Sequence, residues 1–97
     1  MRIRQDWAAL RERSDLAELI AEERRVGAVL MSEGHLRDIW RLPGQHANIG
    51  IWCAADATVL VELLDRLPLR PWLDAHVTAL AAHELQQPAR SAGTSSA

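Results

Sequence analysis

The feature that most constrains the fold is a turn near the middle of the chain, Pro43-Gly44-Gln45-His46. It separates residues 35–42, which alternate as a strand does, from residues 48–53 (N-I-G-I-W-C), which have the composition of a second strand. Proline and glycine supply the backbone conformations that a tight reversal requires. The middle of the chain is therefore predicted to form an antiparallel hairpin.

A helical pattern lies on each side of this hairpin. The first starts after Asp15, which is predicted to form a capping box with Glu18, and Gly34 ends it. The second starts after Asp56, a favourable N-cap residue, and ends at Pro68. Two helices of ordinary length are predicted.

Residues 1–6 and 72–81 complete the pattern as strands. Ile3 has polar and charged neighbours, which favours an edge position for the first strand. The order strand, helix, strand, strand, helix, strand predicts a ferredoxin-like α+β sandwich, βαββαβ, with both helices on one face of an antiparallel sheet. The other face must be covered in so small a chain, which predicts a homo-oligomer, a dimer or higher.

Composition limits the class of protein. Ninety-seven residues suffice for one domain, predicted to span residues 1–84, and the polar segment 85–97 is expected to be a disordered tail. A net charge of −2 argues against nucleic-acid binding, and no apolar run is long enough to cross a membrane. The charged start argues against export, so a cytoplasmic location is expected. Cys53, the one cysteine, has no partner for a disulfide and is expected to pack as a small apolar residue.

Glu23 is the strongest candidate for a catalytic group. At about 100° per residue it falls in the middle of the apolar arc of the first helix. That arc consists of Leu16, Leu19, Ile20, Val26, Gly27 and Leu30. A carboxylate that faces the sheet is desolvated, and desolvation raises its pKa toward the range of a general base. The alternative is a structural carboxylate at the rim of the core or paired with an arginine.

The hairpin holds further candidates within a few residues of its turn. Trp40 and Arg41 are candidate substrate-binding residues, and Arg41 can bind a substrate carboxylate. Asn48 can donate a hydrogen bond to an oxyanion, and His46 can relay a proton. Each also has an ordinary structural explanation, as a solvated arginine, a turn asparagine or an exposed histidine. The four histidines have no metal-binding spacing, so no metal and no cofactor are predicted.

Residues 38–52 (DIWRLPGQHANIGIW) closely resemble the muconolactone Δ-isomerase family, whose core pattern is W-R, two residues, G, two residues, A-N. Residues 67–74 (LPLRPWLD) and 77–83 (VTALAAH) are similar to two later motifs of that family, in the same order. The resemblance implies a ferredoxin-like fold, large homo-oligomers and the cofactor-free isomerisation of muconolactone to 3-oxoadipate enol-lactone. It also aligns Glu23 with the glutamate of the family's active site.

The resemblance implies a role for each candidate. Glu23 removes the C4 proton of the lactone, Asn48 or Arg41 stabilises the dienolate, and an arginine holds the carboxylate arm. Either Glu23 or His46 then delivers a proton to C2. The family pattern has a lysine where this chain has Ile20 and an aromatic residue where it has His46, so a different enolisable substrate, such as a substituted lactone or a polyketide-like ring, is the first alternative. A non-catalytic small-molecule-binding module is the second.

Overall fold

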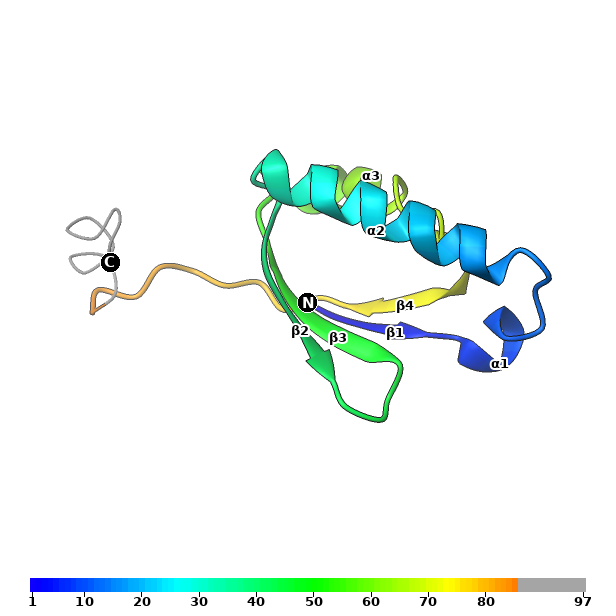
Figure 1. Cartoon of the computed structure of the whole chain (residues 1–97). Coiled ribbons are helices and arrows are strands. Elements are labelled where there is room, and N and C mark those ends of the chain that lie inside the picture. Colours follow the sequence, from blue (N-terminus) through cyan, green and yellow to red (C-terminus); the bar gives the residue numbers. More distant parts are fainter. Residues whose placement is uncertain (86–97) are drawn as a thin grey trace.

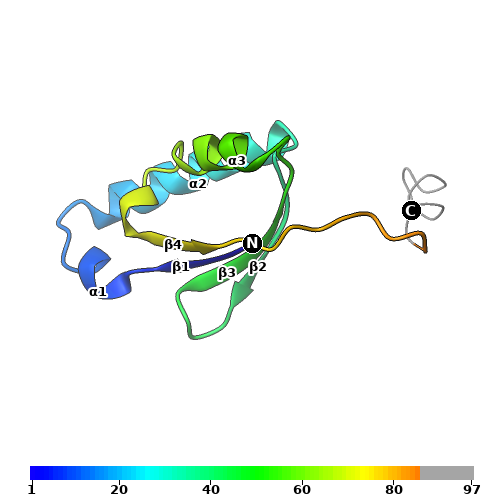
Figure 2. The same cartoon turned by 180° about the vertical axis from the view of Figure 1, so that it is seen from behind.

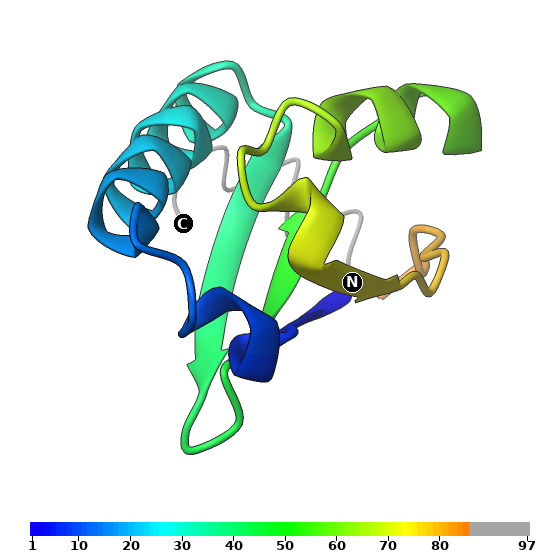
Figure 3. The ribbon, with the colours of Figure 1, turned by 90° about the vertical axis from the view of Figure 1, so that its right-hand side faces the viewer.

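The computed structural model describes residues 1–85, in which a four-stranded antiparallel sheet is covered on one face by two helices (Figure 1). The strands are β1 Arg2–Gln5, β2 Leu36–Leu42, β3 Ala47–Trp52 and β4 Leu73–His76. The helices are α2 Leu16–Ser32 and α3 Ala57–Leu64, and two single turns, α1 Trp7–Leu10 and η1 Arg70–Trp72, join the layers. Figures 2 and 3 show α2 and α3 on the same side of the sheet. The predicted α+β class and the hairpin are confirmed.

The strand order is β2-β3-β1-β4, which places β1 inside the sheet. The predicted edge position of this strand is therefore wrong. Ile3 lies opposite Asn48 on one side and Ala75 on the other, and it is buried. Arg2 and Arg4 alternate with it and are exposed on the opposite face, so the charges do not prevent a central position. The prediction failed because strand alternation lets an inner strand carry charge on its solvent side.

Cross-strand pairing defines two faces of the sheet. The inner face, which the helices cover, carries Ile3 and its partner Asn48, and Arg41 pairs in turn with Asn48. The outer face carries Trp40 opposite Ile49. A β-bulge between Leu36 and Asp38 shifts the register of β2. Because of the bulge, Leu36 and Arg41 both lie on the inner face although Arg41 is five positions after Leu36, an odd offset that would place them on opposite faces of a regular strand.

The core lies between the helices and the inner face. Its buried side chains are contributed by β1, α2, β2, α3 and the α3–β4 connection, and most of them are leucines. They form a cluster of Ile3, Leu30, Leu36, Leu63, Leu64 and Leu67, with Val26, Trp52 and Leu73 among the partly buried residues packed against it. Cys53 is exposed, so the expected packing of this residue is wrong; it lies just after β3, where the chain leaves the sheet.

The helix ends agree with the sequence in part. The Asp56 carboxylate accepts a hydrogen bond from the Val59 backbone N–H at 2.9 Å, which confirms the predicted N-cap of α3. Gly34 takes φ +82° just after α2, a conformation that favours glycine. The capping box at Asp15 is wrong, because this carboxylate makes no cap hydrogen bond and instead pairs with the Arg13 guanidinium at 2.9 Å.

The C-terminal part of the domain is less regular than predicted. Only residues 73–76 of the expected strand 72–81 form β4, and Trp72 belongs to η1. Residues 77–83 have no helix or strand assignment. The predicted disordered tail, apart from Leu85, lies outside the described residues. Within residues 1–85, no helix combines the length and the apolar composition that crossing a membrane demands.

The two helix N-caps provide a matched test of capping. Replacing Asp56 by alanine is expected to lower the free energy of unfolding by about 1 kcal/mol, because the Val59 N–H loses its acceptor. Asp15→Ala removes only an exposed ion pair and is expected to cost less. Urea unfolding of both variants measures the difference. Equal losses would show that Asp15 caps α2 in solution.

Candidate active site

Glu23 lies near the middle of α2, and its carboxylate points toward the protein interior. Its Oε1 accepts a hydrogen bond from the Leu69 backbone N–H at 3.0 Å, in a part-buried environment. The neighbouring Glu22 instead contacts the exposed Arg25 on the other side of the helix. The helical arrangement inferred from the sequence is therefore confirmed, and within residues 1–85 no arginine pairs with Glu23.

Burial raises the pKa of the Glu23 carboxyl above its ordinary value, and the hydrogen bond from the Leu69 N–H opposes this increase in part. Desolvation is the larger of the two effects. A carboxylate in this state is a stronger base than an exposed glutamate. The backbone hydrogen bond also fixes its position, since Leu69 is itself almost fully buried.

Arg41 and Asn48 lie side by side on the inner face of the hairpin, as direct register partners on β2 and β3. Asn48 is partly buried, and its Oδ1 atom is buried without a hydrogen-bond partner among the described residues. Arg41 is exposed, because the hairpin reaches beyond the helices and leaves this end of the inner face uncovered (Figure 1). The hairpin thus places the exposed Arg41 guanidinium and the partly buried Asn48 amide next to each other on the inner face.

Trp40 lies on the outer face, opposite Ile49, and 56 % of its surface is exposed. Within a single chain the sheet therefore separates this indole from Asn48 and from the layer that contains Glu23. Its role in substrate binding stays a prediction.

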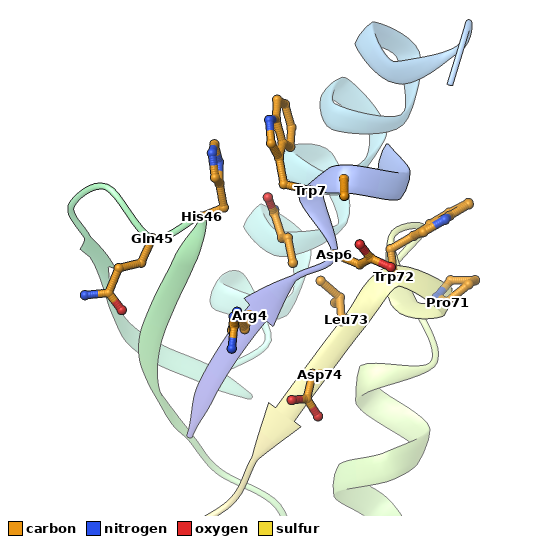
Figure 4. Close-up of a pocket in the computed structure, with 11 residues that line it drawn as sticks. Arg4, Asp6, Trp7, Gln45, His46, Pro71, Trp72, Leu73 and Asp74 are labelled. Carbon is orange, nitrogen blue, oxygen red and sulfur yellow. The ribbon is translucent and has the colours of Figure 1, made fainter. Parts of the chain in front are cut away.

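His46 closes the hairpin turn and lies apart from Glu23. It takes φ +47°, and its ring stacks on the Trp7 indole with centroids 4.5 Å apart and planes 8° from parallel. The backbone N–H of Gln5 donates to the His46 carbonyl at 2.9 Å, which holds the turn against the end of β1. Figure 4 shows the two rings next to each other at the margin of an open groove.

This groove has a volume of about 570 Å³ and opens at the end of the sheet that carries α1 and η1. It is lined by Arg4, Gln5, Asp6, Trp7, Ala8, Gln45, His46, Pro71, Trp72, Leu73 and Asp74 (Figure 4). Of the predicted site residues it contains His46 alone. The structure therefore brings Glu23, Asn48 and Arg41 to one side of the sheet and leaves His46 at a separate groove.

The sequence did not single out two groups that complete the site. One is the Leu69 backbone N–H, which reaches Glu23 from a residue 46 positions later in the chain, and only the fold brings the two together. The other is the Trp52 indole. It packs on the core, but its Nε1 is buried without a partner among the described residues. The alternation of β3, which places residues 48, 50 and 52 on one face, was the available signal.

The side chains on the inner face are of the kinds that can take part in proton transfer. Within residues 1–85 no group of three or more histidine, cysteine or acidic side chains is arranged to hold a metal ion. What the inner face does offer is a basic carboxylate, an amide and a guanidinium. The fold and the site together define an α+β protein with the groups needed for acid–base chemistry on a small anionic molecule.

Comparison with known proteins identifies the family. The family model for muconolactone delta-isomerase matches residues 4–86. Muconolactone Delta-isomerase 2 of Acinetobacter lwoffii is 36% identical over 67 residues, 69% of this chain and 70% of that protein. The Pseudomonas aeruginosa enzyme is 35% identical over 65 residues, 67% and 68% of the two chains. A crystal structure of muconolactone isomerase superposes with a TM-score of 0.69 at 26% identity, covering 86% of this chain and 88% of that one.

The chain belongs to the muconolactone Δ-isomerase family, and it is an enzyme of the isomerase class.

The raised pKa of Glu23 predicts how stability depends on pH. In the folded state this carboxyl keeps its proton above the ordinary value of 4.5, so its contribution to stability falls as pH rises from there through the raised pKa. Glu23→Gln keeps an acceptor for the Leu69 N–H but cannot ionise. The variant is therefore expected to gain stability over the wild type as pH increases across this window.

Urea unfolding of both proteins between pH 4 and pH 8 measures the gain. Glu22→Gln is the control and is expected to show no such increase, because this side chain is exposed. A constant difference between Glu23→Gln and wild type at every pH would contradict a desolvated Glu23.

Proposed function

We propose that this protein converts muconolactone to 3-oxoadipate enol-lactone by a cofactor-free proton shift, with Glu23 as the general base. The observation that carries the proposal is the part-buried Glu23 carboxylate, held by the Leu69 N–H and raised in pKa by burial. The relatives named muconolactone Delta-isomerase support the choice of substrate.

The reaction needs few groups. Removal of the ring proton at C4 leaves a dienolate whose negative charge spreads onto the lactone carbonyl oxygen. Return of a proton to C2 moves the double bond and completes the isomerisation, so protons and electrons balance without an oxidant. A single carboxylate can take the first proton and return it, since the two carbons lie on the same small ring.

Arg41 and Asn48 have complementary tasks in this proposal. Arg41 stands at the exposed end of the inner face, where its guanidinium binds the carboxylate arm of the substrate in a bidentate manner. Asn48 is partly buried on the same face, and its Nδ2 amide group donates to the developing dienolate oxygen. His46 lies at the separate groove, which favours Glu23 over His46 as the group that returns the proton to C2.

Ile20 supports a second candidate substrate. It stands one helical turn before Glu23 and is partly buried, so it adds apolar surface next to Glu23 on the same face of the helix. An apolar neighbour favours a lactone with an additional apolar substituent, on which Glu23 performs the same proton shift. A non-catalytic binding module is less favoured, because the Glu23 carboxylate is part-buried and burying a carboxylate is costly without a use.

The outer face of the sheet supports self-association. Its apolar patch, formed by Trp40, Leu42, Ile49 and Ile51, faces away from both helices. We propose that a second copy of the chain covers this patch and that the protein is a cytoplasmic homo-oligomer. The strand order β2-β3-β1-β4 with two helices on one face supports the ferredoxin-like assignment.

Proton NMR of muconolactone in deuterated buffer tests the reaction and the base. The wild type is expected to produce enol-lactone and to exchange the C4 proton. Glu23→Gln is expected to lower the rate by about 10²- to 10⁴-fold, the usual contribution of a general base.

Glu22→Gln is the matched control and should retain the wild-type rate, because its carboxylate lies on the exposed side of the same turn. Wild-type rates in Glu23→Gln would remove Glu23 from the mechanism. Absence of both conversion and exchange with the folded wild type would rule out muconolactone as the substrate.

Light scattering coupled to size-exclusion chromatography tests the oligomer. The wild type is expected to elute as a dimer or larger, and Ile49→Arg is expected to reduce its mass, because the new charge falls in the outer patch beside Trp40 and Arg2. Met31→Arg introduces the same charge on α2 at a similarly exposed position and should not change the mass. A monomeric wild type would contradict the proposal.

A further inference from the structure

Two polar side-chain atoms on the inner face of β3 are buried without a hydrogen-bond partner in the described residues. They are the Asn48 Oδ1 and the Trp52 Nε1. Leaving a buried polar group unpaired is destabilising, and folded proteins rarely contain such groups without a reason. Two such atoms on one face of one strand make this face a candidate contact surface for a polar molecule.

Gly50 brings the Trp52 indole into this position. It lies between Asn48 and Trp52 on the inner face, and a Cβ atom at residue 50 would stand 2.9 Å from the Trp52 Nε1. The indole nitrogen of Trp52 therefore lies close over the backbone of Gly50. Any larger residue at position 50 would occupy the space that the indole nitrogen uses.

The arrangement has a direction along the hairpin. Arg41 and its partner Asn48 lie toward the open end, whereas Trp52 lies toward the core and packs on the leucine cluster. A molecule whose carboxylate is bound at Arg41 thus extends past Asn48 toward the indole. Because an indole N–H can only donate, the group that it meets must be an acceptor, and the apolar surroundings favour an uncharged one.

We propose that the Trp52 indole N–H donates a hydrogen bond to the ring carbonyl oxygen of the lactone substrate. This inference rests on the proposed function and adds a residue to it. The ring carbonyl is the atom on which negative charge develops when the C4 proton leaves, so the donor contributes more in the transition state than in the ground state. Trp52 is then a catalytic residue that also selects for a ring carbonyl at the buried end of the site.

Kinetics provide the first part of the test. Trp52→Phe keeps an aromatic ring but removes the N–H, and it is expected to lower kcat for muconolactone roughly tenfold or more, with a smaller effect on KM. Gly50→Ala keeps the indole but displaces it and is expected to act in the same direction. Trp72→Phe also loses one indole N–H, at η1 beneath the Arg13 guanidinium, and should retain the wild-type kcat.

The second part detects binding without turnover. The chain has four tryptophans, so protein labelled with ¹⁵N-tryptophan gives four indole signals, and the one absent in Trp52→Phe belongs to Trp52. The probe is the saturated analogue of muconolactone, 2-(5-oxooxolan-2-yl)acetate, which lacks the ring double bond and cannot isomerise. Adding it to the wild type is expected to move the Trp52 indole signal downfield and to leave the Trp72 signal in place.

The outcomes separate the two proposals. If the wild type isomerises muconolactone while Trp52→Phe keeps its kcat and the Trp52 signal does not move, the inference is wrong and the proposed function stands. If the probe moves the Trp52 signal but muconolactone is not converted, Trp52 binds a lactone carbonyl and the proposed reaction is wrong. If the wild type neither binds the probe nor converts muconolactone, both are wrong.

Discussion

Packing of leucine side chains against one face of the sheet is the interaction on which the rest of the structure depends. No charged or polar residue is fully buried in residues 1–85, and the one cysteine is exposed. The core is instead held by contacts of Leu30, Leu63 and Leu64 with β1 and β2. Because the buried residues of this layer are all apolar, a buried polar atom within it is unusual. Glu23, Asn48 and Trp52 supply those atoms, and all three belong to the candidate site.

The site is assembled from segments that are far apart in the chain. α2 contributes the carboxylate, the connection between α3 and β4 contributes the Leu69 N–H that fixes it, and the hairpin contributes Arg41 and Asn48. Helix packing therefore determines the geometry of the proposed base, whereas sheet register determines the geometry of the groups that we propose to bind the substrate. A change in the core that shifts α2 relative to β3 would alter the site without touching a site residue.

Much of this could be predicted from the sequence because it depends on local periodicity. The inward direction of Glu23 follows from helical spacing, and the hairpin follows from its turn residues. The central position of β1 could not be predicted in this way, because Arg2 and Arg4 suggest an edge and only pairing with both β3 and β4 shows that they point outward. The cap at Asp15 failed for a related reason, since Arg13 competes for the same carboxylate. The separation of His46 from Glu23 depends on contacts with Trp7 and Gln5 that no local pattern encodes.

The β-bulge in β2 determines which residues near the hairpin turn lie on the inner face of the sheet. In a regular strand, Leu36 and Arg41 would have opposite parity, so a chain with a buried Leu36 would send Arg41 to the outer face and Trp40 to the inner one. The extra residue of the bulge exchanges the inward-facing and outward-facing positions only in the part of β2 that follows it, toward the hairpin turn. The residues that face inward at the core end of β2 and those that face inward near the hairpin turn therefore follow separate alternation patterns. Insertion or deletion of one residue at this point would exchange a cationic inner surface for an aromatic one and leave the core unchanged, which is a short route from one binding specificity to another.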